Sequence, residues 1–288
     1  MTVHSVLIAG CGDLGIALGL RLSVAGWAVT GLRRHPEALP AGIRPIAADL
    51  ADPASLAVLR GQRFDHVVLA GAPGGFDEAA YRRVYVDGVR NLLGVLEGEP
   101  GVLMVGSTGV YHQEDGSWVD EDSATEPRGF SGRALLEGEA ALRDLAGDRA
   151  SVLRLGGIYG PGRLRLISEV RAGVGCPREP VRFTNRIHRD DAAAILQFLL
   201  EKRAAGQALA PCYLGVDCAP APMWEVRHWL AEQLGVSLDD SRPLSDSRGG
   251  NKRCSNARLL AEGYRFLYPD YRAGYAALLR PVAADGEI

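Results

Sequence analysis

The stretch Val6-Leu7-Ile8-Ala9-Gly10-Cys11-Gly12-Asp13-Leu14-Gly15 decides how this chain folds. Its four apolar residues form a strand-like run, and Gly10, Gly12 and Gly15 follow in the pattern G-x-G-x-x-G before a helical stretch at Ile16–Ala25. Between a strand and a helix, this pattern is typical of a loop that binds the pyrophosphate of a dinucleotide, because glycines permit the tight turn and the close approach of the ligand. The alternative is a cluster of turn glycines without a ligand.

Short apolar runs alternate with helical patterns along the first half of the chain. The runs are Val6–Ala9, Ala28–Leu32, Ile43–Ala48, His66–Ala70, Val102–Val105 and Val152–Leu155. The helical patterns are Ile16–Ala25, Pro53–Leu59, Tyr81–Leu96 and Arg133–Leu145. Nearly continuous apolar runs are typical of strands covered on both faces, and their alternation with helices indicates parallel strands. The sequence therefore predicts an α/β fold of the Rossmann type, with a doubly wound parallel sheet.

The pattern loosens in the second half. We expect residues 1–160 to form a dinucleotide-binding domain that also includes roughly 182–200 and 208–217. We expect 161–288 to form mainly a smaller, C-terminal substrate-binding region. The expected elements there are a helix capped by Asp190, a strand at Cys212–Val216, an amphipathic helix at Met223–Leu234, a mobile loop or lid at Asp239–Ser255 and an aromatic-rich segment at Tyr264–Leu279 that packs back onto the body.

The end of the second strand discriminates between the two nicotinamide dinucleotides. An acid at this place binds the ribose hydroxyls of NAD, but this chain has Arg33 and Arg34 there. Arginine pairs with phosphate, so the sequence favours NADP(H) over NAD(H), unless both arginines are merely solvated. Asp49-Leu50 and Ala70-Gly71-Ala72 follow the next two strands, where this fold binds its ligand. We therefore expect the cofactor to contact Gly10, Cys11, Gly12, Asp13, Leu14, Gly15, Arg33, Arg34, Asp49, Leu50, Ala70 and Gly71.

Composition narrows the range of partners. The 288 residues carry a formal net charge of −3, too balanced to hold a phosphate backbone, so we expect no nucleic acid. No apolar run approaches the roughly 20 residues that span a bilayer, so we expect no membrane and a cytoplasmic protein. Five cysteines without a C-x-x-C pair favour reduced thiols. His112, Glu114 and Asp115 crowd one loop, but loop polarity explains them, and we expect no metal.

Several short blocks follow the glycine loop in a specific order. They are Asp49-Leu50, Ala70-Gly71-Ala72, Ser107-Thr108-Gly109-Val110-Tyr111, Glu121, Arg154-Leu155-Gly156-Gly157-Ile158-Tyr159-Gly160-Pro161-Gly162 and Ile187-His188-Arg189-Asp190-Asp191. In this order they resemble the extended, NAD-dependent epimerase/dehydratase branch of the short-chain dehydrogenase/reductase superfamily. The resemblance covers most of the chain and implies a nicotinamide cofactor with oxidoreductase or epimerase chemistry.

The resemblance fails at the catalytic pair. In that family a Tyr moves the substrate proton, a Lys four residues later lowers its pKa, and a Ser orients the oxygen. Ser107 matches the Ser, but the Tyr and Lys positions fall on Ser131 and Leu135. None of the nine tyrosines has a lysine four residues later, and the two lysines, Lys202 and Lys252, lie far from this helix in sequence. The chain therefore resembles the atypical members that keep the fold without the pair.

Other side chains are candidates for the missing chemistry. Tyr111 offers a phenol beside Ser107, and both are our candidate catalytic residues; the alternative for Tyr111 is packing at a strand end. Arg163, Arg186 and His188 are candidate substrate-binding residues, the arginines for a phosphate or carboxylate. The alternatives are that the arginines are solvated and that His188 caps the helix that follows.

Two functions are consistent with these residues. The first is an NADP(H)-binding, epimerase/dehydratase-like oxidoreductase with altered catalytic residues, acting on a small polar, sugar-derived or nucleotide-linked substrate. The second is a non-catalytic NADP(H)-binding redox sensor or regulatory protein. The resemblance also implies a homodimer through Tyr81–Leu96 and Arg133–Leu145. The second helix carries an apolar set that is too large for one narrow core stripe, although burial against the sheet is the alternative: Leu135, Leu136, Leu142 and Leu145.

Overall fold

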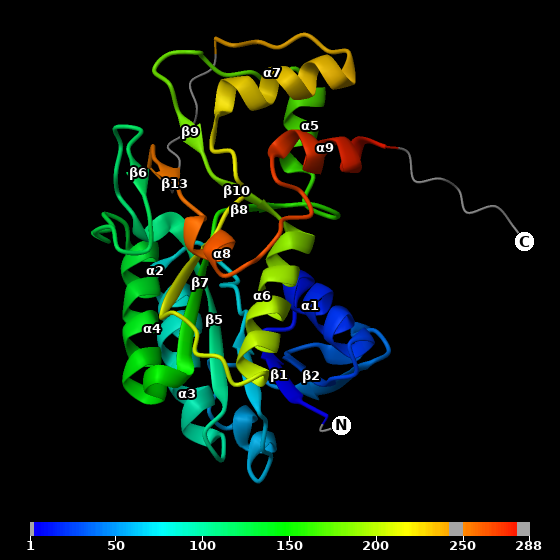
Figure 1. Cartoon of the computed structure of the whole chain (residues 1–288), viewed down its shortest axis with the longest axis vertical. Helices are drawn as coiled ribbons and strands as arrows, with labels where there is room; N and C mark the ends of the chain where they lie inside the picture. Colours follow the sequence, from blue (N-terminus) through cyan, green and yellow to red (C-terminus); the bar gives the residue numbers. More distant parts are fainter. Residues whose placement is uncertain (1–2, 242–249, 281–288) are drawn as a thin grey trace, which may run out of the picture.

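A seven-stranded parallel sheet forms the centre of the molecule (Figure 1). The computed structural model describes residues 3–241 and 250–280. The strands are β1 (Ser5–Ala9), β2 (Ala28–Arg33), β3 (Ile43–Ala47), β4 (His66–Leu69), β5 (Gly101–Ser107), β7 (Ala150–Leu155) and β11 (Cys212–Gly215). Their order is β11-β7-β5-β4-β1-β2-β3, so the chain leaves β3 and crosses to the other side of β1. This reversal creates a crevice at the carboxyl ends of β1 and β4. The predicted Rossmann-type fold class is confirmed.

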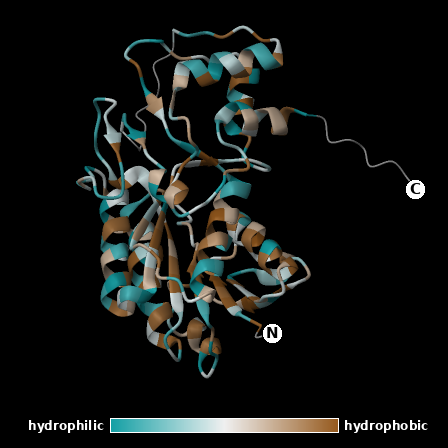
Figure 2. Ribbon diagram, viewed as in Figure 1, coloured by the Kyte–Doolittle hydropathy of each residue, from teal (hydrophilic) through white to brown (hydrophobic). Residues whose placement is uncertain are grey.

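Helices cover both faces of the sheet, as Figure 1 shows. On one face α1 (Asp13–Val24) packs against α6 (Arg189–Ala204), and on the other lie α3 (Gly88–Val95) and α4 (Phe130–Ala146). The strand β1 explains the two layers, because Val6 and Ile8 enter one apolar core while Leu7 and Ala9 enter the other. Figure 2 shows the same arrangement as largely hydrophobic strands between helices that carry both hydrophobic and hydrophilic residues.

Two predicted helices have a different form in the structure. The expected helix Tyr81–Leu96 is divided into α2 (Glu78–Arg82), a five-residue π-helix at Arg83–Asp87 and α3. A π-helix holds one extra residue per turn, which hydrophobic periodicity does not reveal, and it is common near functional sites. The expected helix Pro53–Leu59 is a 3₁₀ turn at Ser55–Leu59.

A smaller group of elements lies beyond the carboxyl ends of the strands (Figure 1). It contains α5 (Arg165–Arg171), α7 (Met223–Leu234), α9 (Tyr271–Leu279) and the short strands β8 (Gly157–Tyr159), β9 (Phe183–Thr184), β10 (Arg186–His188) and β12 (Ala221–Pro222). These helices share a core of their own with Tyr159. The helix predicted at Met223–Leu234 is confirmed, and the predicted domain boundary at residue 160 stays a prediction.

The predicted lid at Asp239–Ser255 falls partly on 242–249, which lie outside the described residues. Its far end forms β13 (Arg253–Cys254), which pairs with β6 (Trp118–Val119) and precedes α8 (Ala257–Ala261). In the aromatic-rich segment after α8, Tyr264 packs into the core beneath α6. This agrees with the expectation that the segment packs onto the body.

The leucines of α4 are mostly absorbed by the molecule itself. Leu135 and Leu142 are buried in two of the cores, and Leu136 is half-buried, whereas Leu145 is exposed. The homodimer therefore stays a prediction. No helix within residues 3–241 and 250–280 is both long and apolar enough to cross a membrane.

Candidate functional site

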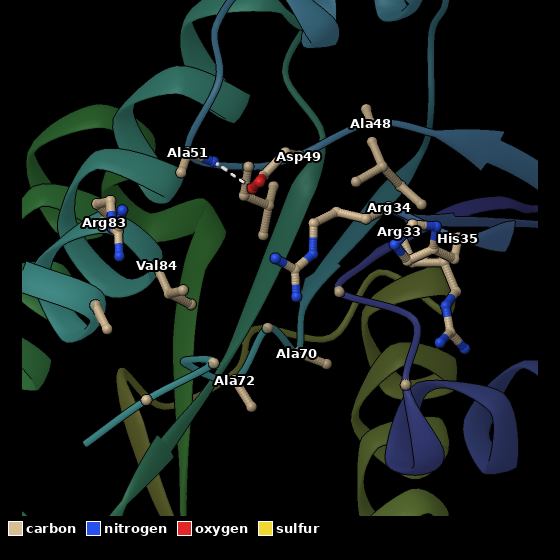
Figure 3. A pocket seen from close by; sticks show the side chains of 18 of the residues that line it. Arg33, Arg34, His35, Ala48, Asp49, Ala51, Ala70, Ala72, Arg83 and Val84 are labelled. Carbon is tan, nitrogen blue, oxygen red and sulfur yellow. Dashed lines mark hydrogen bonds between the residues drawn. The ribbon is translucent and has the colours of Figure 1, made fainter. Parts of the chain in front are cut away.

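A pocket of about 620 Å³ opens at the crevice between β1 and β4 (Figure 3). It is lined by all of the predicted cofactor-contacting residues except Cys11 and Gly15. Ala72, from the segment that the sequence placed at the ligand, also lines it, and the lining residues that sequence reasoning missed are Leu32, His35, Ala48, Ala51, Gly74, Gly75, Asp77, Ala80, Arg83 and Val84. Many of these lie on the loop after β4 or on the π-helix. In that loop, the adjacent Gly74 and Gly75 are a pattern from which the sequence could have indicated that the backbone approaches a ligand.

The glycine loop has the shape that a dinucleotide needs. Gly10 has a φ of +82°, and a Cβ added there would overlap the backbone of Gly71. A Cβ at Gly12 would meet nothing nearer than 3.9 Å, so the backbone there faces open space in the pocket. Gly15 instead faces the sheet, because its Cβ would lie 3.0 Å from Ile8 Cγ2. Volume, bare backbone and the helix start together fit a dinucleotide.

Cys11 belongs to the core beneath the loop and not to the pocket lining. Its side chain is fully buried, and burial raises the pKa of its thiol to about 11, although the charge of Arg33 opposes this. Its carbonyl oxygen accepts a hydrogen bond of 3.4 Å from the Arg33 guanidinium. The buried side chain of Cys11 is therefore not available to the cofactor, and only a contact through the Cys11 backbone stays a prediction.

Basic side chains surround the β2 end of the pocket. Arg33 and His35 lie at one wall, and Figure 3 shows Arg34 extending into the pocket from the same side. Arg83 lies on the opposite wall. Asp49 is turned toward its own loop, where Oδ1 accepts a hydrogen bond of 3.0 Å from Ala51 N. Basic side chains therefore predominate at this end of the pocket.

Arg163 lies in a different place from the one we expected. It lines the same pocket as the glycine loop, and its Nε donates to Asp13 Oδ2 at 2.6 Å. Arg189 donates to the other oxygen of the same carboxylate at 3.1 Å. The predicted substrate residue Arg163 therefore stands at the cofactor pocket, joined to the first residue of α1.

Tyr111 is a packing residue with a structural partner. Its side chain is 1% exposed, and its hydroxyl accepts a hydrogen bond of 2.8 Å from Arg154. Arg154 also forms two hydrogen bonds, 3.0 and 2.7 Å long, with the buried carboxylate of Glu139. Burial raises the pKa of Tyr111 above its ordinary value, although Arg154 opposes this. A phenol with a raised pKa is poorly suited to proton transfer near neutral pH, and Tyr111 does not line the pocket.

The two positions of the missing pair hold no replacement. Leu135 is 4% exposed and packs in the same core as Tyr111, while Ser131 is half-buried in the first turn of α4. Ser107 is half-buried too, and its Oγ accepts a hydrogen bond of 3.1 Å from Gly109 N, which leaves its hydroxyl hydrogen available.

Lys252 is close to this region despite its distance in sequence. The pairing of β13 with β6 brings it beside Tyr111, where its Nζ donates to the carbonyl oxygen of Tyr111 at 3.1 Å. Its side chain is 1% exposed, and burial lowers its pKa. Only the three-dimensional pairing could reveal this neighbour.

His188 and Arg186 have structural roles and do not reach the pocket. His188 is the N-cap of α6, where its Nδ1 accepts a hydrogen bond of 3.2 Å from Asp190 N, so the prediction that Asp190 caps this helix is wrong. The alternative that His188 caps the helix is confirmed: the cap lies two residues before Asp190, which is inside the first turn. Arg186 is 5% exposed and donates to Thr184 Oγ1 at 2.5 Å.

A buried carboxyl group lies beside these strands. Asp217 is 1% exposed, its backbone N–H donates to the Arg186 carbonyl oxygen at 2.7 Å, and its Oδ1 accepts from Ala219 N at 3.1 Å. Burial raises the pKa of Asp217 to about 7, although the charge of Arg186 opposes this. In the unfolded chain the same carboxyl ionises near pH 3.8.

We expect this carboxyl to weaken the fold as pH rises. Between pH 4 and 7 the unfolded chain loses the proton that the folded chain keeps, so Asp217 removes up to about 4 kcal/mol of stability over that window. Asp217→Asn should flatten the fall in unfolding free energy measured by urea denaturation between pH 4 and 7.5. The exposed Asp144→Asn is the control. An unchanged slope in Asp217→Asn would contradict the expectation.

No group of three or more His, Cys, Asp or Glu side chains within residues 3–241 and 250–280 is placed to hold a metal ion.

Comparison with known proteins shows which family this chain belongs to. Residues 4–172 match the model of the RmlD substrate-binding domain, which covers more than half of the chain. Protein YeeZ of Escherichia coli K12 is 28% identical over 280 residues, which cover 93% of this chain and 97% of YeeZ. YeeZ thus matches both the sheet and the smaller C-terminal group of elements.

Solved structures agree with this placement. A protein from Methylobacillus flagellatus, described as a candidate NAD-dependent epimerase/dehydratase, is 40% identical with a TM-score of 0.81 and covers 96% of this chain and 98% of its own. The human epimerase family protein SDR39U1 (isoform 2), solved with NADPH, has the same fold at 23% identity, with a TM-score of 0.75 and coverage of 94% and 97%. This chain therefore belongs to the RmlD substrate-binding-domain family, as an atypical member of the extended short-chain dehydrogenases/reductases, the NAD(P)-binding epimerase/dehydratase group.

Proposed function

We propose that the protein binds NADP(H) in the pocket between β1 and β4 and acts as an epimerase/dehydratase-like oxidoreductase with altered catalytic residues. The observation that carries the proposal is the end of β2, where Arg33 and Arg34 line the pocket at the place where an acid selects NAD. The NADPH in the human structure of the same fold supports it. The cytoplasmic location remains our prediction.

Each end of the pocket has residues for one part of the cofactor. The glycine loop and the start of α1 would bind the pyrophosphate through backbone N–H groups. Arg34 and Arg33 would pair with the 2'-phosphate, since a guanidinium binds phosphate through charge-assisted bonds. When bound, the nicotinamide supplies hydride transfer to or from a carbon of the substrate. We propose a small polar substrate, sugar-derived or nucleotide-linked, on the strength of family membership.

Ser107 is the residue that we propose for orienting the substrate oxygen. Its Oγ is held by Gly109 N, and its own O–H can still donate. No described side chain at the positions of Ser131 and Leu135 can take the role of the missing Tyr or Lys, because one is a serine and the other an apolar core residue. Chemistry on this chain would therefore rely on cofactor binding and orientation more than on a tuned acid.

Arg34→Ala is expected to weaken NADPH binding about ten- to a hundredfold and to leave NADH binding unchanged. The change removes a charge-assisted contact that only the 2'-phosphate uses, worth about 1.5–3 kcal/mol. Titration followed by nicotinamide fluorescence measures both affinities. Arg90→Ala is the matched control, since Arg90 is exposed on α3 and does not line the pocket. Equal losses for NADPH and NADH would contradict an assignment of Arg34 to the 2'-phosphate.

A non-catalytic NADP(H) sensor is the second candidate function. The observation in its favour is that Tyr111 is bound by Arg154 inside the core and that Leu135 fills the lysine position. Neither group can then move a substrate proton.

Turnover separates the two functions. An enzyme should either oxidise NADPH with a keto-sugar nucleotide or small ketone, which is reduced to the alcohol, or epimerise or dehydrate a sugar nucleotide with no net change in NADP(H). Ser107→Ala should slow that reaction without weakening NADPH binding. A sensor should show no turnover across such a panel, but its thermal stability should differ between its NADPH and NADP⁺ complexes.

A further inference from the structure

Arg163, which lines the pocket, directly follows a tight turn. Its backbone N–H donates to the Gly160 carbonyl oxygen at 2.9 Å, and Pro161 and Gly162 occupy the two central positions. Gly162 has a φ of +76°. Proline followed by a glycine with positive φ is typical of a type II turn, which fixes the direction of the residue after it. The turn follows β8, which belongs to the smaller group of elements. Arg163 therefore reaches the pocket between β1 and β4 from that group.

The partner that holds the guanidinium belongs to the phosphate-binding loop itself. Arg163 Nε donates to Asp13 Oδ2, while Arg189, the first residue of α6, donates to Asp13 Oδ1. Asp13 is the first residue of α1 and directly follows Gly12. The contact therefore joins three separate parts of the chain at the start of the helix that would receive the pyrophosphate.

The two arginines reduce the repulsion that Asp13 would exert on a bound diphosphate. A carboxylate at the start of α1 stabilises the helix, but it would repel a diphosphate that binds at the same place. The two arginines on Asp13 offset its charge. Arg189 is itself shared with Asp190, through bonds of 3.0 and 2.8 Å, whereas Arg163 has no second acidic partner among the described residues.

Arg163 keeps most of its donors for a ligand. A guanidinium has five N–H groups, and in the part of the chain that the structure describes only the Nε of Arg163 has a side-chain acceptor. The four N–H groups of its two terminal nitrogens remain, on a side chain that is 41% exposed and lines the pocket. A planar fork with free N–H groups matches the oxygens of a phosphate.

We propose that Arg163 binds the pyrophosphate of the dinucleotide and that Asp13 positions it to do so. The guanidinium then closes over the glycine loop and slows release of the cofactor. This inference rests on the proposed function, since it assigns a further residue to the same cofactor. It also moves Arg163 from the substrate, where the sequence placed it, to the cofactor.

Two probes distinguish a phosphate contact from a general effect on the pocket. NADPH contains the pyrophosphate, whereas adenosine 2'-monophosphate carries the adenosine and the 2'-phosphate without it. In Arg163→Gln, we expect the NADPH affinity to fall at least about tenfold and the release rate in stopped-flow fluorescence to rise correspondingly. The affinity for adenosine 2'-monophosphate, measured by calorimetry, should stay within about twofold.

The controls come from the same loop and the same pocket. Arg165→Gln removes a neighbouring arginine that is 88% exposed and pairs with Glu169, so both affinities should stay unchanged. Arg34→Ala should weaken both probes. Arg163→Lys keeps the charge without the fork and should fall between wild type and Arg163→Gln. Thermal denaturation confirms that each variant folds.

The outcomes separate this inference from the proposed function. If wild-type protein binds NADPH and Arg163→Gln binds it equally well, the role of Arg163 is overturned and the proposed function stands. If Arg163→Gln loses both probes equally, Arg163 acts by shaping the pocket and the phosphate contact is overturned. If the wild-type protein binds neither probe, the proposed function fails and the inference fails with it.

Discussion

Gly10→Ala is expected to abolish NADPH binding and to lower the free energy of unfolding by more than about 3 kcal/mol. Gly10 has a φ of +82°, which costs an L-residue about 1–2 kcal/mol. A Cβ there would also overlap the backbone of Gly71, so the glycine loop and the end of β4 would have to separate. Backbone cannot yield as a flexible side chain does, and the displaced loop would no longer present its N–H groups to phosphate.

Gly26→Ala is the matched control for that substitution. Gly26 has the same φ of +82°, but a Cβ there would meet nothing within 4 Å. Gly26→Ala therefore introduces the backbone strain without the steric overlap. It should lower the free energy of unfolding by about 1–2 kcal/mol and leave NADPH binding intact. Urea denaturation and fluorescence titration measure the two effects. Equal costs for the two variants would show that the close approach of Gly10 and Gly71 has no energetic weight.

Arg154→Leu is expected to destabilise the protein by about 3–5 kcal/mol, because the buried carboxylate of Glu139 loses both of its close hydrogen bonds and keeps, among the described residues, only the exposed Arg143 guanidinium, 4.0 Å away. Both side chains are buried, at 8% and 1% exposure, and the pair forms a two-pronged contact that also holds the Tyr111 hydroxyl. Chemical denaturation monitored by tryptophan fluorescence gives the change.

A second ion pair on the same helix provides the comparison. Arg82 and Glu137 also form a two-pronged contact, but their side chains are 44% and 35% exposed. Water screens such a pair and solvates the partner that remains, so Arg82→Leu should have a much smaller effect. If Arg154→Leu were as mild as Arg82→Leu, the buried pair would have no structural role.

The sheet was predictable because each of its strands carries its own signal. Val6–Ala9 is apolar at every position and Val152–Leu155 at every position except Arg154, as burial on both faces favours, and glycines mark where the first run ends. The ends of elements depended on local chemistry that the pattern does not contain. Both Asp190 and His188 were possible caps of α6 from the sequence, and only the structure shows that the imidazole nitrogen of His188 accepts the N–H bond that carboxylates usually accept.

The site was predictable where its residues follow strands directly. Gly12, Arg34 and Asp49 lie just beyond β1, β2 and β3, so the fold alone brings them to one edge. Arg163 and Lys252 depend on long-range pairing, through the turn after β8 and through β13. No local pattern indicates which strand end such residues will reach.

The edge strand β11 has a consequence for synthesis. It lies at one edge of the sheet, beside β7. The first residue of β11 follows the last residue of β7 by 57 positions, and α6 lies between them in the chain. At about 5–20 residues per second, a ribosome needs roughly 3–11 s to cross that interval. Throughout it, β7 presents unpaired backbone groups, and for most of it α1 also lacks α6, which covers it; an exposed strand edge of this kind invites aggregation. We therefore expect a fragment that stops before Cys212 to keep the edge of β7 exposed and to aggregate more readily than the full chain.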